Sequence, residues 1–337
     1  MDKKKNRYKI GILGAGSWGL TLANVLFDNN NDVVIWEFDP KQCDKLSKER
    51  RFYPLGDYRI PDELVITNSL SEAVSSKDYI IFSLPSSTIR TVTEKISHLK
   101  FPVDPVIIST VKGFDHKSLK RPSEILRMNL GKRRKIAVLS GPSHAEEVIK
   151  RIPTAVVAAS VNRDVNTAIQ TLFSNIYFRV YTTSDIKGVE LGGALKNIIA
   201  ISSGIAKGLN LGDNTRAALV TRGNAELMRL GLKLGAKKAT FNGLSGIGDL
   251  VVTCFSDHSR NFKFGRLIGQ GYNMKEALKI IKVTVEGVGA SECCYRISKK
   301  NYIQMPLCNM VYEILFKGKN PQKACQELMM RPLKSET

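Results

Sequence analysis

The chain has 337 residues, with 51 Lys and Arg against 31 Asp and Glu, so its formal charge is +20 at pH 7. Its 43% hydrophobic residues suffice for packed cores in two domains and exclude a disordered, fibrous or low-complexity chain. The positive charge attracts anions of any kind, but no zinc-finger spacing, RNA-binding aromatic signature or basic heptad accompanies it, so we expect a solvated lysine-rich surface and no nucleic-acid partner.

The sequence predicts no targeting segment, membrane span or metal site. Residues 1–7 are charged and lead into a strand-like run rather than a signal-peptide core. Apolar runs such as Tyr79–Leu84 are far shorter than the roughly 20 residues that span a bilayer. The six cysteines form no Cys-x-x-Cys pair, and the four histidines share no ligand spacing with them. We therefore expect a cytoplasmic protein that does not span a membrane.

The first half alternates short apolar runs with helix-like stretches, which is typical of a parallel sheet with helices on both faces. Strands are predicted over residues 9–13, 32–37, 79–84, 106–110, 136–140, 154–159 and 178–182. After Asp185 the sequence is helical, as in the apolar stripe from Leu307 to Leu315 that Gly318 ends. The sequence thus predicts an α/β fold, with a doubly wound domain over residues 1–185 and an all-α domain over residues 186–337.

A glycine-rich turn joins the first predicted strand to the first helix, over Gly14 to Gly19 (GAGSWG). Gly14 permits a tight turn, Gly16 lets the backbone approach a pyrophosphate, and Gly19 lets the helix pack on the strand. An acidic residue, Glu37, ends the next strand and suits the ribose 2′-hydroxyl of NAD, although Asp39 lies on the same side and is the alternative. We therefore predict a dinucleotide site that favours NAD over NADP.

Two further strand ends should line the same crevice, at the carboxyl edge of the sheet, and another strand end carries polar groups. Lys112, in Thr110 to Gly113, offers a charge to a substrate oxygen or phosphate, or is a surface lysine. Ser83 to Ser86 should also line the crevice, while the segment Ser140 to Glu146 offers backbone N–H groups and a serine hydroxyl. His144 in that segment is predicted to be structural rather than a catalytic base.

The helical half opens with a lysine among small residues. On a helix, Lys196 shares a face with Gly192, Gly193, Ala200 and Ser203, so its amine faces space that another group could fill. Such a lysine can exchange a proton with a substrate.

Three later motifs add polar groups. Asp249, in a glycine-rich loop, either orients a lysine or caps a helix. Ser259-Arg260-Asn261 begins an amphipathic segment and is suited to a phosphate. Glu286, between Val285 and Gly287, could contact a cofactor.

Taken in order and spacing, these motifs resemble the bacterial type of NAD(P)-dependent glycerol-3-phosphate dehydrogenase over nearly the whole chain. The motifs are GAGSWG at 14–19, VKG at 111–113, SGPS at 140–143, GGALKN at 192–197, GIGD at 246–249, SRN at 259–261 and VEG at 285–287. The resemblance implies a Rossmann-type N-terminal domain and a cytoplasmic homodimer. It also implies interconversion of dihydroxyacetone phosphate and sn-glycerol 3-phosphate for phospholipid synthesis.

The resemblance also implies roles for single residues. Lys196 would be the proton acceptor, and Asp249 and Lys112 would be the other catalytic residues. The residues implied in binding the phosphorylated substrate are Lys112, Gly141, Ser143, Lys196, Asp249, Ser259, Arg260 and Asn261. Those implied or predicted in binding the cofactor are Gly14, Gly16, Ser17, Trp18, Gly19, Glu37, Lys112, Ala145, Arg260 and Glu286.

One departure concerns Glu37, because many bacterial members carry an arginine there, which suits the 2′-phosphate of NADP.

Two alternatives compete with the glycerol-3-phosphate dehydrogenase interpretation. One is a β-hydroxyacid dehydrogenase, which also places a lysine near an asparagine on a helix. The other is a noncatalytic nucleotide sensor or nucleic-acid-binding protein.

Overall fold

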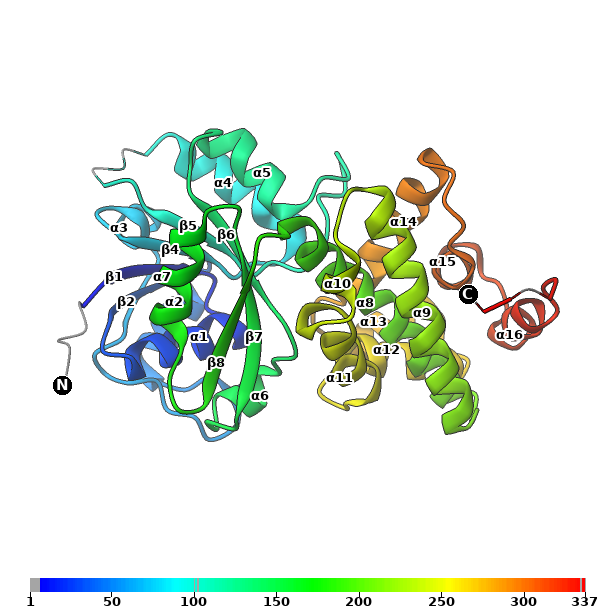
Figure 1. Ribbon diagram of the computed structural model, residues 1–337. Coiled ribbons are helices and arrows are strands. Elements are labelled where there is room, and N and C mark those ends of the chain that lie inside the picture. The colour runs from blue at the N-terminus through cyan, green and yellow to red at the C-terminus, as the bar shows by residue number, and fades with distance from the viewer. Residues whose placement is uncertain (1–6, 100, 102, 334, 337) are drawn as a thin grey trace. The chain divides into compact units, whose positions relative to one another are not determined.

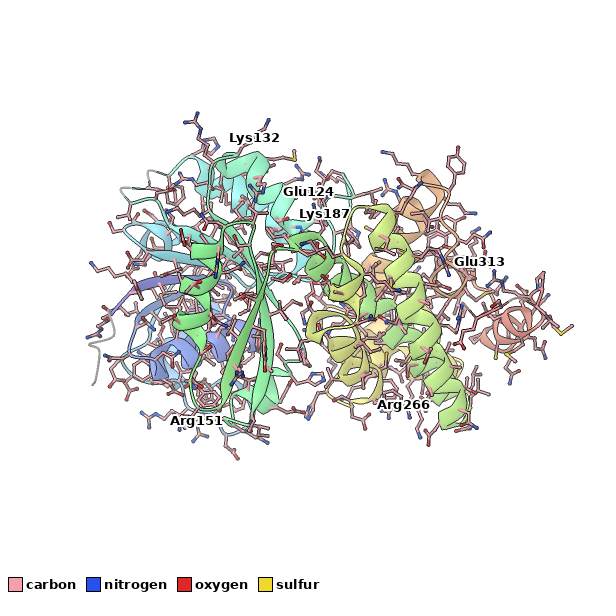
Figure 2. All side chains as sticks on the ribbon, viewed as in Figure 1. Glu124, Lys132, Arg151, Lys187, Arg266 and Glu313 are labelled. Carbon is pink, nitrogen blue, oxygen red and sulfur yellow. The ribbon has the colours of Figure 1, made fainter. Side chains whose placement is uncertain are left out.

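The computed structural model describes residues 7–99, 101, 103–333 and 335–336. Two compact units meet between Glu190 and Leu191, inside one long helix, five residues after the boundary that the sequence predicts. The sequence's positive charge is concentrated in its first ten residues and in residues 115–135, and positions 1–6 of the first segment lie outside the described residues. The second segment, residues 115–135, is described, and its Lys132 is exposed at the surface (Figure 2).

The first unit is built on a twisted sheet, which has eight strands among the described residues (Figure 1). Their bounds are β1 Lys9–Leu13, β2 Asp32–Trp36, β3 Val65–Thr67, β4 Tyr79–Phe82, β5 Val106–Ser109, β6 Ile136–Ser140, β7 Thr154–Ala159 and β8 Phe178–Thr183. Their order is β3-β2-β1-β4-β5-β6-β7-β8. The seven predicted strands are confirmed within two residues at their ends, whereas the three-residue β3 is too short to show a pattern in the sequence.

One pair of strands departs from the predicted parallel arrangement, because β7 runs antiparallel to β6. Only the four-residue helix α6 (Ala145–Val148) lies between them. A helix of that length rises about 6 Å, while a five-residue strand covers about 16 Å, so α6 cannot carry the chain back to the start of β6. The helix thus does not make the crossover that joins parallel strands, and β7 runs back beside β6.

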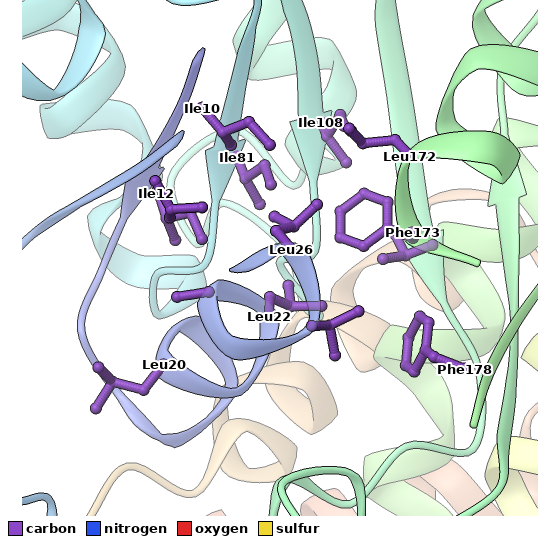
Figure 3. Packing of buried hydrophobic residues seen from close by; sticks show 14 of the residues in the cluster. Ile10, Ile12, Leu20, Leu22, Leu26, Ile81, Ile108, Leu172, Phe173 and Phe178 are labelled. Carbon is purple, nitrogen blue, oxygen red and sulfur yellow. The ribbon is translucent and has the colours of Figure 1, made fainter. Parts of the chain in front are cut away.

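Helices cover both faces of this sheet. They are α1 Ser17–Asp28, α2 Pro40–Glu49, α3 Leu70–Val74, α4 Ile89–Ser97, α5 Pro122–Leu130, α6 and α7 Arg163–Phe173. Neighbouring strand residues point to opposite faces, so Ile81 packs in one buried cluster and Ile80 in another. Figure 3 shows the first cluster, where Leu26 of α1 lies beside Phe173 and below the strand residues Ile81 and Ile108. Burial on both faces explains why apolar residues follow one another along these strands instead of alternating with polar ones.

The second unit is helical throughout its described residues. Its helices are α8 Ile186–Gly208, which begins in the first unit, and α9 Asp213–Lys233, α10 Lys238–Phe241, α11 Asp249–Phe255, α12 Arg260–Gly269, α13 Met274–Ile281, α14 Glu286–Lys300, α15 Pro306–Lys317 and α16 Pro321–Met329. The predicted apolar stripe is confirmed as α15, which Gly318 ends at φ 67°. Within the described part of the chain, none of the helices combines the length and apolarity needed to cross a membrane.

One expectation about this unit is wrong. The glycine-rich segment before Asp249 is not a loop but a π-helical turn over Leu244–Gly248. The space beside Gly192 is filled by this turn, because a Cβ on Gly192 would lie 2.4 Å from the carbonyl oxygen of Ser245. The absence of a side chain at Gly192 thus lets the turn pack directly against α8.

Candidate active site

The glycine-rich turn between β1 and α1 has the geometry that a dinucleotide site requires. Gly14 has φ +113°, and a Cβ there would lie 2.3 Å from the carbonyl oxygen of Ser83, so another residue would be strained and would clash. A Cβ on Gly16 would meet nothing within 4 Å, which leaves open space at the start of α1. Ser17 and Trp18 begin this helix, which has no side-chain cap. Its first N–H groups therefore suit a pyrophosphate.

Glu37 and Asp39, the two candidates for the ribose contact, accept hydrogen bonds from different backbone N–H groups. Asp39 is the N-cap of α2 and accepts a hydrogen bond from Lys41 N at 3.1 Å. Glu37 directly follows β2 and accepts from Asp39 N at 3.1 Å. Burial raises the pKa of the Glu37 carboxyl above its usual value, although the N–H of Asp39 opposes the shift. Each carboxylate thus accepts one backbone N–H, and Glu37 is the one directly after the strand.

Three predicted substrate residues of the first unit meet at one carbonyl. Lys112 Nζ donates to the carbonyl oxygen of Gly141 at 3.4 Å, and Ser143 Oγ donates to the same oxygen at 3.0 Å. Ala145 follows, and its carbonyl oxygen lies 3.5 Å from Thr21 Oγ1 of α1. The segment after β6 is thus tied both to Lys112 and to the helix of the dinucleotide turn.

The loop that follows Lys112 is fixed by an ion pair that sequence reasoning missed. Arg90 of α4 donates to both carboxylate oxygens of Asp115, at 3.1 and 2.7 Å. Asp115 also accepts from Ser118 N at 2.8 Å. The Arg90 guanidinium holds the pKa of the Asp115 carboxyl well below its usual range. Residues 25 apart cannot be paired from spacing alone, so no signal in one sequence identifies this contact.

The second unit buries Lys196 beside an acid and a hydroxyl. Lys196 and Asp249 are 7% and 1% exposed, and the ammonium donates to the Asp249 carboxylate. It also donates to Thr253 Oγ1 at 2.7 Å, while that hydroxyl donates to the carbonyl oxygen of Asp249 at 2.6 Å. Asp249 therefore orients the lysine rather than capping a helix by its side chain. Thr253 was missed, although its spacing of four residues from Asp249 puts both on one face of α11.

Burial raises the pKa of the thiol of Cys254, which follows Thr253 in the sequence, to about 12. That thiol therefore stays protonated near neutral pH.

A chain of amide contacts extends this cluster. Asn261 Nδ2 donates to Asn197 Oδ1 at 2.9 Å, and Asn261 Oδ1 accepts from Gly287 N at 2.9 Å. These bonds bring the starts of α12 and α14 to the residue after Lys196. Glu286, a predicted cofactor contact, is the first residue of α14. Asn197 was part of a recognised motif but had no predicted role.

The remaining two predicted substrate residues lie at the start of α12. Ser259 is its N-cap, and Ser259 Oγ accepts from Phe262 N at 3.2 Å, which leaves the hydroxyl proton for another partner. Arg260 follows with an exposed side chain. An exposed cation in the first turn of a helix suits an anionic ligand.

Family models describe both units. The family model for the NAD-dependent glycerol-3-phosphate dehydrogenase N-terminus matches residues 9–166. The model for the C-terminus of the same family matches residues 185–326. A glycerol-3-phosphate dehydrogenase [NAD(P)+] of Fusobacterium nucleatum is 42% identical over 330 residues, which are 97% of this chain and 98% of the relative. The chain belongs to this family.

Further relatives of the family agree along the whole chain. A glycerol-3-phosphate dehydrogenase [NAD(P)+] of Thermoanaerobacter is 44% identical over 97% of this chain and 98% of its own. The crystal structure of glycerol-3-phosphate dehydrogenase from Coxiella burnetii matches with a TM-score of 0.93 and 37% identity, over 96% of this chain and 99% of its own. Membership in this family excludes the hydroxyacid dehydrogenase and the noncatalytic sensor as descriptions of the chain.

Proposed function

We propose that the chain interconverts dihydroxyacetone phosphate and sn-glycerol 3-phosphate, with Lys196 as general acid and base. The observation that carries this proposal is the buried lysine held by Asp249 and Thr253, in a chain of the glycerol-3-phosphate dehydrogenase family. A bound nicotinamide supplies the hydride to the central carbon, or accepts it in the reverse direction.

The proposed path of the proton follows from the position of Lys196. During reduction, Lys196 Nζ donates a proton to the carbonyl oxygen, which becomes the hydroxyl; during oxidation, the neutral amine takes the hydroxyl proton. Asp249 and Thr253 hold Nζ in one orientation, because each accepts one of its hydrogen bonds. We assign one ammonium proton of Lys196 to the substrate oxygen.

The phosphate and the other polar groups of the substrate have proposed partners. Arg260 and Asn261 are assigned to the phosphate, with the Ser259 hydroxyl beside them. Lys112 and Ser143 converge on the Gly141 carbonyl and are assigned to the substrate's oxygens. Phosphate binding would hold the reacting carbon in place, so substrates without a phosphate should lose kcat as well as affinity.

For the cofactor we propose a preference for NAD over NADP, on the basis of Glu37. An ionised carboxylate accepts hydrogen bonds from the ribose 2′-hydroxyl and repels a 2′-phosphate. Glu37 would bind the adenosine ribose, the open space at Gly16 would admit the pyrophosphate, and Ala145 and Glu286 are assigned to the cofactor on the family resemblance. Cytoplasmic location, supply of glycerol 3-phosphate for phospholipid synthesis and a homodimer are proposed on the family resemblance.

The cofactor and the substrate are tested together by absorbance at 340 nm with dihydroxyacetone phosphate and either NADH or NADPH. We expect kcat/KM with NADH to exceed that with NADPH, and Glu37→Gln to reduce this ratio about tenfold or more. Asp39→Asn is the matched control and should leave the ratio unchanged. Equal use of both cofactors, or a ratio that responds to Asp39 instead, would overturn the assignment of Glu37. Oxidation of neither cofactor by folded protein would overturn the proposed reaction.

A further inference from the structure

Arg216 in the first turn of α9 has a buried guanidinium that lies over two aromatic rings. Its central carbon is 4.3 Å from the ring centroid of Phe255 and 5.4 Å from that of Phe262. Its Nη2 donates to the carbonyl oxygen of Cys254 at 3.3 Å. Ser203 Oγ donates to the same oxygen at 2.8 Å, so two side chains satisfy a carbonyl in the last turn of α11.

These contacts bracket the segment to which the phosphate is assigned. Phe255 is the last residue of α11, and Phe262 directly follows Asn261. The six residues between the two rings, 256–261, include Ser259, Arg260 and Asn261. One guanidinium therefore contacts the chain immediately before and immediately after the segment.

Stability alone does not account for an arginine at this position. The side chain is 10% exposed, and its carboxylate partner Asp213 is 94% exposed at 3.4 Å, so the buried charge gains little from that pair. Its Nε is buried without a hydrogen-bond partner among the described residues, which also costs stability. Arginine, unlike lysine, has a planar face that can contact two rings while its edge binds a carbonyl.

We propose that Arg216 is a positioning residue, which acts through Phe255, Phe262 and the Cys254 carbonyl to hold residues 256–261 in the conformation that binds the substrate's phosphate. The proposal rests on the assignment of the phosphate to Arg260 and Asn261. It makes no claim of direct contact between Arg216 and the substrate.

The test compares dihydroxyacetone phosphate with dihydroxyacetone, which lacks the phosphate. Arg216→Lys keeps the charge but loses the planar face, and we expect it to raise the KM for dihydroxyacetone phosphate about tenfold. The KM for NADH and the kcat/KM for dihydroxyacetone should change less than about twofold. A general loss of structure would instead lower the activity with both substrates together.

Two controls separate the possible failures. Ser203→Ala removes the other donor to the Cys254 carbonyl without touching either ring, so it should leave the KM for dihydroxyacetone phosphate within about twofold. Arg260→Ala should raise that KM selectively; if it does not, the phosphate assignment fails and the role of Arg216 fails with it.

If Arg260→Ala behaves as expected but Arg216→Lys leaves the KM unchanged, or affects both substrates equally, the inference about Arg216 alone is overturned. If Arg216→Lys does not fold, Phe262→Leu tests the same contact. It should raise the KM for dihydroxyacetone phosphate about threefold, in the same selective way. An unselective effect, or none, would overturn the inference.

Discussion

The buried pair of Lys196 and Asp249 predicts how the variant Asp249→Asn will respond to pH. Asparagine keeps the size of the side chain but removes its charge, so the ammonium is left buried without a carboxylate. Both side chains are less than a tenth exposed, so solvent screens the pair weakly. Breaking a buried ion pair by removal of one partner costs about 3–5 kcal/mol.

The folded variant can avoid a buried charge only by carrying a neutral amine. Releasing the proton of a lysine with an unfolded-state pKa of about 10.4 costs about 1.4 kcal/mol for each pH unit below that value. The cost is thus about 4–5 kcal/mol at pH 7 and about 1 kcal/mol at pH 9.5. Because the unfolded variant then binds more protons than the folded one, the variant's stability rises with pH across this interval.

Urea unfolding at pH 7 and pH 9.5 measures this difference. We expect Asp249→Asn to lie about 4 kcal/mol below the wild type at pH 7, and the difference to shrink by more than half at pH 9.5. The double variant Lys196→Met with Asp249→Asn carries no buried ammonium and should show a difference that is independent of pH. A deficit below about 1 kcal/mol at pH 7, or the same deficit at both pH values, would refute the reasoning.

Three further predictions follow from single contacts. Thr253→Val removes an acceptor of the Lys196 ammonium at constant side-chain size. In steady-state assays kcat should therefore fall about tenfold, while the KM for dihydroxyacetone phosphate stays unchanged. An unchanged kcat would contradict the role given to the Thr253 hydroxyl. Asp115→Asn should lower the unfolding free energy at pH 7 by about 2 kcal/mol. Arg90 holds the pKa of Asp115 below its usual value, so that stabilisation is present at neutral pH and is lost as the pH falls below about 4. A difference in unfolding free energy between wild type and Asp115→Asn that persists in acid would count against the ion pair. Gly14→Ala should destabilise the first unit by about 2 kcal/mol or more and abolish NADH binding measured by fluorescence, because of the positive φ and the contact with Ser83; wild-type stability and affinity would refute the account of the turn.

The sheet could be predicted largely because its strands are buried on both faces. Such strands are continuous Val and Ile runs, and the glycine-rich turn fixes where the first one ends. The short edge strand β3 has an exposed Val65 and no such run. The reversal of β7 depends on the length of α6, which the sequence between the two strands does not reveal by periodicity.

Within the site, single residues could be predicted where their chemistry is unusual for their surroundings, as with Lys196 among small residues. Their partners were harder to predict, because folding joins positions that are distant in sequence. Thr253 lies 57 residues from the lysine that it contacts. Arg216 has no motif around it, and its contacts arise only from the packing of α9 against the ends of α11 and α12.

The central claim is that Lys196 transfers the proton, and chemical rescue tests it most directly. The rate of NADH oxidation with saturating dihydroxyacetone phosphate would be measured at 340 nm for the variant Lys196→Ala, without and with small primary amines. The account predicts a loss of kcat of at least about 10²-fold and a partial recovery that rises with amine concentration and depends on amine basicity. A Lys196→Ala variant that folds, binds NADH and keeps a kcat near that of the wild type would contradict it.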